Sequence, residues 1–509
     1  MKPLSDFKPP QLGDLLAGLS VALIIMPQAI AYAELAGLSP VIGLAAAAFP
    51  AIVAAFFVSS PYLQTGPTAM TSLLTFATLS HLAPTQSANY IALAALLALL
   101  VGIIRIAIGR LGLGAVAYLI SQPVLLGFST GAAILIVASQ LPSVFGYRSS
   151  APHVILGAWD SLIHMGQWQL EGLILSLLAF ALILGGRRFH ALFPGVLVAV
   201  VLTSLYSYYR HFEGQTLGHI EAAWPQLQLI FPWEQIPNLI LSAMVIAVIG
   251  FAEVAAIARS YATQERQIWD ANREFISQGM ANLAAAFCGA FPVGGSFSRS
   301  ALNHLAGAKT RWSGAFTGFL TLGLLPLAPL LSSLPKSVLA AIIIASVLKL
   351  ISIQALIKMW RYSHSQSVIA WVSFASCLLF SPRVDIAVII GVSLSIAHHL
   401  RREQQLMCEH EIDSEGALHL KPKGVLWFGS SATLEKRYHE LLAQYKDLKK
   451  VIFHFSGLGR IDLSAALLLE RLKEDSEKSG IEVIFTEVPP MAKSWEKRIW
   501  DDDLPSAKI

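Results

Sequence analysis

Long apolar runs separated by short polar stretches fill the first four-fifths of the chain. A helix that crosses a bilayer needs about 20 mostly apolar residues. Twelve runs approach this length, at about residues 12–34, 38–58, 88–109, 115–141, 167–186, 190–209, 236–258, 274–291, 312–331, 335–352, 366–381 and 383–400. Two further apolar pieces, 66–79 and 296–307, are too short to span and are broken by glycine and proline. The pattern therefore predicts an α-helical polytopic membrane protein of about fourteen segments.

The two short pieces occupy matching positions in the chain. Each is the third of seven segments, within residues 12–209 and 236–400 respectively. Because seven is odd, two consecutive seven-helix halves must be inverted relative to each other. Interrupted segments at matching positions in two halves are typical of a transporter's binding site. The sequence therefore predicts two inverted repeats and points to 66–79 and 296–307 as the site. The alternative is that both pieces are re-entrant kinks with a structural role.

Charged residues are distributed unevenly. Residues 1–402 contain 21 of the 36 Lys and Arg residues and 13 of the 32 Asp and Glu residues, a balance of +8. Residues 403–509 contain the other 15 basic and 19 acidic residues, a balance of −4. This shift in composition predicts a transmembrane transport domain over residues 12–402 followed by a soluble domain.

The basic residues also predict an orientation. With the N-terminus placed inside, the cytoplasmic positions include Arg105, Arg110, Arg187, Arg188, Arg259, Arg266, Arg273, Lys309, Arg311, Lys349, Lys358, Arg361, Arg401 and Arg402. The outside keeps only Arg148, Arg210, Lys336 and Arg383. Cytoplasmic loops carry an excess of Lys and Arg, so both termini are expected in the cytoplasm.

The short segments contain the residues of a helix start. In residues 64–70, QTGPTAM, Pro67 suits the first helical position, and Thr65 or Thr68 suits the cap. In residues 294–303, GGSFSRSALN, Ser296 or Ser298 suits the cap in the same way. If both helices begin near the bilayer centre, their amide-rich ends converge on one cavity, and such a cavity attracts anions.

Arg299 lies in the first turn of the second short segment, where the helix dipole disfavours a cation. A charged side chain within a span is a functional hypothesis by default, and we interpret Arg299 as facing an anion. Glu253, in the span 236–258, is interpreted as a proton acceptor that neutralises Arg299 in the empty site. The alternatives are a structural ion pair between the two residues, or a Glu253 that reaches the membrane surface.

Gln28 and Tyr32 lie four residues apart in the first span and share one helix face. Both side chains can donate hydrogen bonds to an anion. The alternative is that they pack between helices and hold them together.

Several stretches of the chain resemble the sulfate permease (SulP) family, which includes plant sulfate transporters, bacterial bicarbonate and dicarboxylate transporters and prestin. These stretches are 18–44, 65–72 (TGPTAMTS), 253–262, 270–274 and 291–303 (FPVGGSFSRSALN). The resemblance implies seven plus seven inverted helices, in which a core domain moves against a gate domain and the anion site lies between the third and tenth helices. It implies substrate contacts at Gln28, Tyr32, Thr65, Thr68, Phe297, Ser298 and Arg299, and proton coupling at Glu253.

The same resemblance bears on the coupling ion. Sodium-coupled bicarbonate members of the family have aspartate at the eighth-helix position and lack the tenth-helix arginine. This chain has Glu253 and Arg299, as the proton-coupled sulfate transporters do. The expectation is therefore proton-coupled sulfate uptake by alternating access. The alternatives are a bicarbonate or dicarboxylate transporter of the family, or an anion channel or exchanger. A nucleobase symporter is disfavoured, because its relatives carry a carboxylate on the tenth segment.

The tail resembles the STAS domain that ends most SulP proteins, here expected over residues 415–509. Residues 424–430, 449–458 and 481–488 are expected as strands, and residues 430–445 and 462–480 as helices. In signalling STAS proteins a phosphorylatable residue directly follows an aspartate. In this chain Leu463 follows Asp462. A role as a signalling protein, with the tail as its active part, is therefore disfavoured.

The chain contains no glycine-rich phosphate-binding loop followed by Lys and Ser or Thr, so ATP hydrolysis and an enzymatic activity are not expected. No metal, cofactor or nucleic acid is expected either. The expected partners are a small anion, protons, the lipid bilayer and a second copy of the chain. The expected location is the plasma (inner) membrane, with both termini in the cytoplasm.

Overall fold

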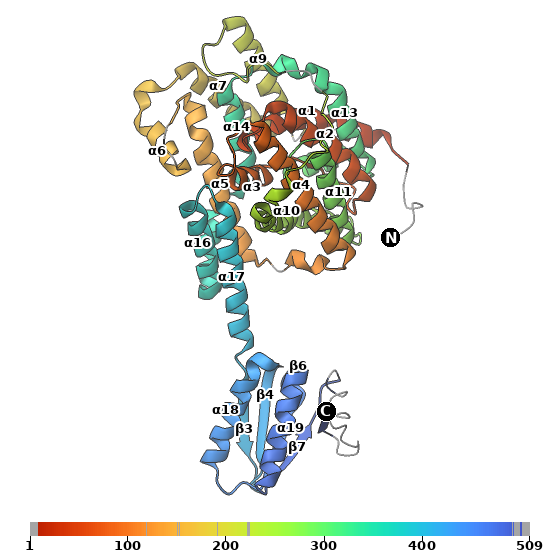
Figure 1. The fold of residues 1–509 in the computed structure, drawn as a ribbon, viewed down its shortest axis with the longest axis vertical. Helices are drawn as coiled ribbons and strands as arrows, with labels where there is room; N and C mark the ends of the chain where they lie inside the picture. Colours follow the sequence, from red (N-terminus) through yellow and green to blue (C-terminus); the bar gives the residue numbers. More distant parts are fainter. Residues whose placement is uncertain are drawn as a thin grey trace. The chain divides into compact units, whose positions relative to one another are not determined.

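A computed structural model describes residues 9–118, 120–149, 151, 153–190, 192–220, 224–490, 492 and 499–500. The chain divides into two compact units, Met1–Val392 and Ser393–Ile509. The first unit is built of helices, and the second is an α/β domain with a five-stranded sheet (Figure 1). The expected fold class is thus confirmed.

The helices of the first half are α1 (Leu12–Leu35), α2 (Pro40–Phe57), α3 (Ala69–Leu79), α4 (Ala88–Arg110), α5 (Gln122–Phe145), α6 (Val154–Ile163), α7 (Leu170–Phe180), α8 (Gly186–Phe189) and α9 (Gly195–Arg210). Those of the second half are α10 (Ile236–Gln264), α11 (Ala271–Phe287), α12 (Phe297–Leu305), α13 (Trp312–Leu324), α14 (Lys336–Val347), α15 (Ile353–Tyr362), α16 (His364–Leu379) and α17 (Val384–Glu403). The two short segments are α3 and α12, so the expected order of elements is confirmed.

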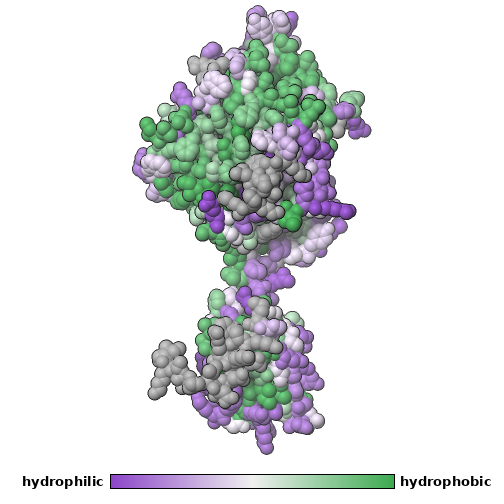
Figure 2. All heavy atoms as spheres, turned by 90° about the vertical axis from the view of Figure 1, so that its right-hand side faces the viewer, coloured by the Kyte–Doolittle hydropathy of each residue, from purple (hydrophilic) through white to green (hydrophobic). Residues whose placement is uncertain are grey.

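Eight helical stretches of the described residues are long and apolar enough to cross a membrane. They contain α1, α2, α4, α5, α10, α13, α14 and α17. The face of the first unit in Figure 2 is correspondingly hydrophobic over most of its described surface. This is the surface expected of a protein whose solvent is lipid, because apolar side chains that face acyl chains lose nothing by their exposure.

Two helices, α6 and α15, were not expected from the sequence. Each has only ten residues, which is too short for a span, and each leaves large apolar side chains exposed, such as Trp159 on α6 and Trp360 on α15. Helices of this kind typically lie along a membrane surface. Both follow the fifth segment of their half, so they extend the match between the two repeats.

The helices of the first unit pack into two groups. In the core bundle, defined as α1–α4 with α10–α13, α4 packs along α11, and α2 packs on α11 and α13. In the gate bundle, defined as α5–α9 with α14–α16, α5 packs on α14 and α16. Glycines allow the closest approaches: a side chain on Gly43 would collide with the carbonyl of Ala29, and one on Gly127 with that of Ala370. Small residues at helix contacts are typical of membrane bundles.

The two halves meet in a pair of very short strands, β1 (Thr65–Gly66) and β2 (Gly294–Gly295). The strands are antiparallel, with Thr65 opposite Gly295 and Gly66 opposite Gly294. They occupy matching positions, directly before α3 and α12. A two-fold axis between inverted repeats makes equivalent strands antiparallel, as observed. The pair therefore holds the N-termini of α3 and α12 close together inside the core bundle.

The second unit contains β3 (Met407–Ile412), β4 (Leu418–Leu426), β5 (Lys450–His454), β6 (Leu458–Ile461) and β7 (Glu482–Thr486), with α18 (Phe428–Gln444) and α19 (Leu463–Lys478). The sheet order is β3-β4-β5-β7, and β6 pairs with β4. Among the described strands of this sheet, only β3 is antiparallel to its neighbour. Alternate residues of β4, such as Leu418 and Leu420, are buried beneath the helices.

The expected strand over 424–430 is wrong in its second half. Gly424–Leu426 end β4, and helix α18 begins at Phe428. The side chain of Ser430 accepts a hydrogen bond from the Trp427 amide at 3.1 Å, and this contact favours a helix start over a longer strand. Strand β3 was not expected, because three of its six residues, Glu409, His410 and Glu411, are polar or charged.

The turn between β3 and β4 is organised by Asp413. Its carboxylate accepts hydrogen bonds from the amides of Ala417 at 2.8 Å and Glu415 at 2.9 Å, and contacts His419 Nε2 at 3.1 Å. The Ala417 amide and the His419 side chain hold the pKa of Asp413 below its usual range. The carboxylate therefore stabilises the hairpin above the pKa of an unfolded aspartate, about 3.9, and this contribution is lost as the pH falls through the lower, folded pKa.

We predict that Asp413→Asn accelerates hydrogen exchange of the β3–β4 hairpin in the full-length protein at pH 7, and that the difference from the wild type narrows below about pH 4. Exchange of the two proteins would be compared by mass spectrometry at each pH. Glu415→Gln is the matched control, because it removes a charge from the same turn and keeps the hydrogen bonds to Asp413. A difference that persists unchanged at pH 3 would contradict the role of the ionised carboxylate.

Candidate functional site

A cavity of about 820 Å³ opens beside the N-termini of α3 and α12. Helices α1, α3, α10 and α12 of the core bundle line it, together with the end of α14 from the gate bundle. Six of the seven predicted substrate residues and the predicted proton acceptor are in its wall: Gln28, Tyr32, Thr68, Phe297, Ser298, Arg299 and Glu253. The structure thus brings together residues from four helices that lie far apart in the sequence.

Thr68 caps the first short helix. Its Oγ1 accepts a hydrogen bond from the Thr71 amide at 3.2 Å and lies 3.0 Å from Thr71 Oγ1. Helix α3 begins at Ala69, so Pro67 precedes the cap and does not occupy the first helical position as expected. The proline still ends the extended stretch of β1, because its ring fixes the backbone and provides no amide hydrogen.

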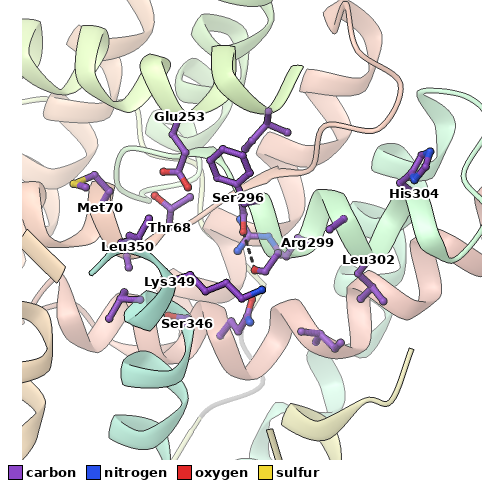
Figure 3. Close-up of a pocket in the computed structure, with 18 of the residues that line it drawn as sticks. Thr68, Met70, Glu253, Ser296, Arg299, Leu302, His304, Ser346, Lys349 and Leu350 are labelled. Carbon is purple, nitrogen blue, oxygen red and sulfur yellow. Dashed lines mark hydrogen bonds between the residues drawn. The ribbon is translucent and has the colours of Figure 1, made fainter. Parts of the chain in front are cut away.

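The second short helix has no comparable cap. Ser296 is the residue before α12, and its side chain accepts no hydrogen bond from the backbone amides of the first turn. Its Oγ instead lies 3.2 Å from Ser298 Oγ, the contact drawn in Figure 3. The first amides of a helix have no partner within the helix. At α12 they therefore remain available to an anion in the cavity.

Arg299 is the most unusual side chain of the cavity. It is only 1% exposed, and its Nε and both terminal nitrogens have no hydrogen-bond partner among the described residues. Gly66 leaves room beside it, because a Cβ there would lie 3.4 Å from one terminal nitrogen. A buried charge without a partner is costly. The geometry therefore leaves the hydrogen-bond donors of the guanidinium unused among the described residues.

Glu253 and Lys349 contribute the other charges. Glu253 projects from α10 toward Thr68 in Figure 3, and among the described residues no ion pair joins it to Arg299. The structural ion pair considered from the sequence is thus not formed. Lys349, which was expected at the cytoplasmic surface, is exposed in the turn just after α14, where it also lines the cavity and extends toward Arg299. The cavity wall therefore contains two cations, Arg299 and Lys349, and one carboxylate, that of Glu253.

Gln28 and Tyr32 lie on the α1 wall of the cavity, and each is 4% exposed. The side-chain oxygen of Gln28 is buried without a partner among the described residues. Both residues lie on the shared helix face that the sequence predicted, and the Tyr32 hydroxyl also contacts Ser346 of α14. Thr65 is placed differently from the prediction. Its Oγ1 accepts a hydrogen bond from Gln278 Nε2 at 2.8 Å, and Thr65 is absent from the cavity wall.

Arg105 is a site-supporting residue that the sequence did not reveal. It was expected at the cytoplasmic surface, but it is 0% exposed within the core bundle. Its side chain donates hydrogen bonds to the carbonyls of Ala247 at 3.1 Å, Ile246 at 3.2 Å and Val293 at 3.0 Å. Arg105 therefore ties α4 to α10 and to the segment that leads into α12. An arginine near a helix end resembles a snorkelling residue, so nothing in the local sequence marks this role.

We predict that Arg105→Met lowers the unfolding temperature of the purified protein and weakens anion binding at the cavity. Each buried carbonyl that loses its donor costs about 1–3 kcal/mol. Arg110→Met is the matched control, because Arg110 lies at the exposed end of the same helix. Thermal unfolding followed by intrinsic fluorescence would measure both variants. Equal unfolding temperatures for the two would show that the contacts of Arg105 do not support the site.

Comparisons with known proteins agree with this architecture. A protein named "Probable sulfate transporter 4.2" from Arabidopsis thaliana is 34% identical over 395 residues, which cover 75% of this chain and 58% of that protein. The chain thus spans a little over half the length of that plant relative. A "Probable sulfate transporter" from Mycobacterium tuberculosis is 32% identical over 397 residues, covering 77% of this chain and 70% of that protein.

Solved structures share the fold. The murine Solute Carrier 26 family member A9 anion transporter in its inward-facing state superposes with a TM-score of 0.87 at 22% identity, over 97% of this chain and 89% of that one. The transmembrane domain of the cyanobacterial bicarbonate transporter BicA gives a TM-score of 0.66 at 25% identity, over 75% of this chain and 97% of that one.

The family models agree with both units of the fold. The model of the "Sulfate permease family" matches residues 12–373, and that of the STAS domain matches residues 412–496. The chain therefore belongs to the sulfate permease family and carries a STAS domain after its membrane-spanning part.

Proposed function

We propose that the protein is a secondary active transporter of a small anion, with sulfate as the first candidate substrate and protons as the coupling ion. The observation that carries this proposal is the buried guanidinium of Arg299, unpaired among the described residues, at the junction of two helix N-termini. Relatives named as sulfate transporters support it. These relatives are transporters, and no enzymatic activity is proposed.

The cavity offers an anion donors from several directions. The planar guanidinium of Arg299 provides a fork that matches two oxygens of an oxyanion. The uncapped first turn of α12 provides backbone amides, and the side chains of Gln28, Tyr32 and Ser298 line the same wall. Sulfate has four oxygens and needs many donors once it leaves water. The wall is therefore better suited to an oxyanion than to a cation or a neutral solute.

The charges of the cavity favour a divalent anion as the first candidate. Arg299 and Lys349 together carry two positive charges, which match the two negative charges of sulfate. Bicarbonate is the second candidate, because the chain shares its fold with the bicarbonate transporter BicA. A monovalent anion would leave one of the two cations without a counter-charge while Glu253 is protonated.

Glu253 supplies a route for proton coupling. In the empty cavity its carboxylate and the guanidinium of Arg299 balance each other in charge. An anion that binds to Arg299 adds a negative charge beside Glu253, and a proton taken up by the carboxylate removes the repulsion between them. Anion and proton then share one loaded state. This is the requirement for symport: each solute must favour the binding of the other.

The arrangement of the bundles supports alternating access. The substrate wall belongs mainly to the core bundle, whereas Lys349 belongs to the gate bundle. At the other end of α14, Lys336 forms an ion pair at 3.1 Å with Glu34 of α1. This ion pair joins the gate bundle to the core bundle on the predicted outer side. We propose that the state described here is open toward the predicted cytoplasmic side, and that the core bundle moves against the gate bundle.

Several sequence-based expectations remain part of this proposal. They are a transport domain over 12–402, a cytoplasmic STAS domain over 415–509, cytoplasmic termini, residence in the plasma (inner) membrane and the pairing of two copies of the chain. The expectation of a substrate contact at Thr65 is revised to a supporting role, because Thr65 lies outside the cavity wall and its hydroxyl accepts a hydrogen bond from Gln278.

We predict that Arg299→Ala reduces anion uptake tenfold or more, because a hydrogen bond to a charged group is worth about 1.5–3 kcal/mol. Arg299→Lys keeps the charge but loses the fork, so an intermediate loss is expected. The assay is uptake into liposomes of labelled sulfate, bicarbonate, fumarate or chloride, with and without an inward proton gradient. Arg188→Ala, at an exposed arginine, is the control. Wild-type uptake by Arg299→Ala would disprove the site assignment.

We predict that Glu253→Gln loses uptake driven by a proton gradient but retains exchange of sulfate for sulfate. The amide keeps the size of the side chain and cannot take up the coupled proton. The two activities would be measured in the same liposome preparation. Glu234→Gln, at an exposed position just before α10, is the control. Accumulation of sulfate by a well-folded Glu253→Gln protein on a proton gradient would mean that another group carries the proton.

A further inference from the structure

A second, smaller cavity of about 170 Å³ lies in the gate bundle. Residues from α5, α14, the connection after α5, the residue before α7 and the connection after α9 form its wall, and none of them lines the central cavity. The described part of the wall contains two cations, Arg148 and Lys336, and no acidic residue. Arg148 has no ion-pair partner among the described residues. The cavity therefore carries a positive charge that the wall itself does not balance.

The N-terminus of α14 borders this cavity. Helix α14 has 12 residues, and the residue before it is Pro335, whose side chain cannot accept a capping hydrogen bond. The Lys336 amide donates to the carbonyl of Gln215 at 2.9 Å. The next residue, Ser337, also lines the cavity. The amides and the dipole of a helix start favour negative charge.

An independent observation comes from the hydroxyl of Ser337. The residue is 4% exposed, and its Oγ has no hydrogen-bond partner among the described residues. Gly172 of α7 leaves space beside this hydroxyl, because a Cβ there would lie 3.4 Å from Ser337 Oγ. Buried hydroxyls are usually hydrogen-bonded, so a free one in the wall of a charged cavity indicates an unfilled contact.

We propose that this cavity is a second anion site, in which Arg148, Lys336, Ser337 and the first turn of α14 hold a small inorganic anion such as sulfate or a halide. The site is separate from the central cavity and does not depend on the transport function proposed above. Its size excludes large organic anions, and its wall offers a guanidinium, an ammonium, a hydroxyl and the amide of Ser337, all of which are donors to an anion.

The position of Lys336 gives the second site a consequence for the two bundles. The same ammonium pairs with Glu34 of α1 at 3.1 Å, and this ion pair joins the gate bundle to the core bundle. An anion in the second site competes with Glu34 for Lys336. An anion in the second site therefore weakens the ion pair between Lys336 and Glu34 that joins the bundles. Conversely, removal of the Glu34 carboxylate strengthens binding of the anion.

The test is equilibrium binding of radiolabelled sulfate to the full-length protein in detergent, at constant ionic strength. An Arg299→Ala background removes the main cation of the central cavity. In this background we expect one bound sulfate per chain. Adding Arg148→Ala should weaken the affinity of this protein for sulfate tenfold or more. Adding Ser337→Ala should weaken the affinity for sulfate severalfold. Adding Glu34→Gln should tighten it, because Lys336 is then released to the anion.

Arg210→Ala is the matched control, because Arg210 is an exposed arginine that does not line the second cavity. It should leave sulfate binding unchanged. The proposal is overturned if the Arg299→Ala protein binds no sulfate, or if Arg148→Ala and Arg210→Ala have equal effects. Unfolding temperatures of all variants establish that they are folded. Failure of sulfate uptake by the wild type would contradict the proposed function without affecting this binding result.

Discussion

The membrane part of this protein depends on one constraint: a backbone interrupted inside the bilayer must find hydrogen bonds within the protein. The interruption before α3 and the one before α12 satisfy each other through the antiparallel pairing of β1 and β2. Polar side chains complete the arrangement behind the strands. Asn282 receives a hydrogen bond from the Val293 amide, Arg105 donates to the Val293 carbonyl, and Gln278 donates to Thr65. These polar residues behind the cavity therefore hold the interrupted backbone in place. The side chains of the cavity wall are not needed for that purpose and are left free for a ligand.

The contrast between two buried arginines separates scaffold from site. Arg105 and Arg299 are both almost completely buried in the core bundle. Arg105 donates to three backbone carbonyls, whereas all three nitrogens of Arg299 have no partner among the described residues. Burial alone would assign the same role to both. The state of their hydrogen bonds distinguishes a cation that holds the helices together from one whose donors remain unused among the described residues.

Much of the fold could be predicted from the sequence, because apolar length and the position of a broken segment are local properties of the chain. The same holds for Thr68 and Arg299, which stand at recognisable helix starts. The amphipathic helices α6 and α15 were missed because they are too short to register as spans. The placements of Thr65, Arg105 and Lys349 depend on partners from other helices, such as Gln278 for Thr65, and no local pattern contains that information.

Helix α14 links the two cavities of the membrane part. Lys336 at its start lines the smaller cavity, and Lys349 just beyond its end lines the larger one. Thirteen residues of helical chain separate them by about 20 Å. Both cations belong to the gate bundle, whereas Glu34 and Arg299, which face them, belong to the core bundle. A movement of the core bundle along α14 would change the electrostatic partners of both lysines at once. If the bundles move as proposed, the charge interactions of Lys336 and Lys349 therefore change together. The reason is that a short, well-packed helix transmits a displacement and does not absorb it.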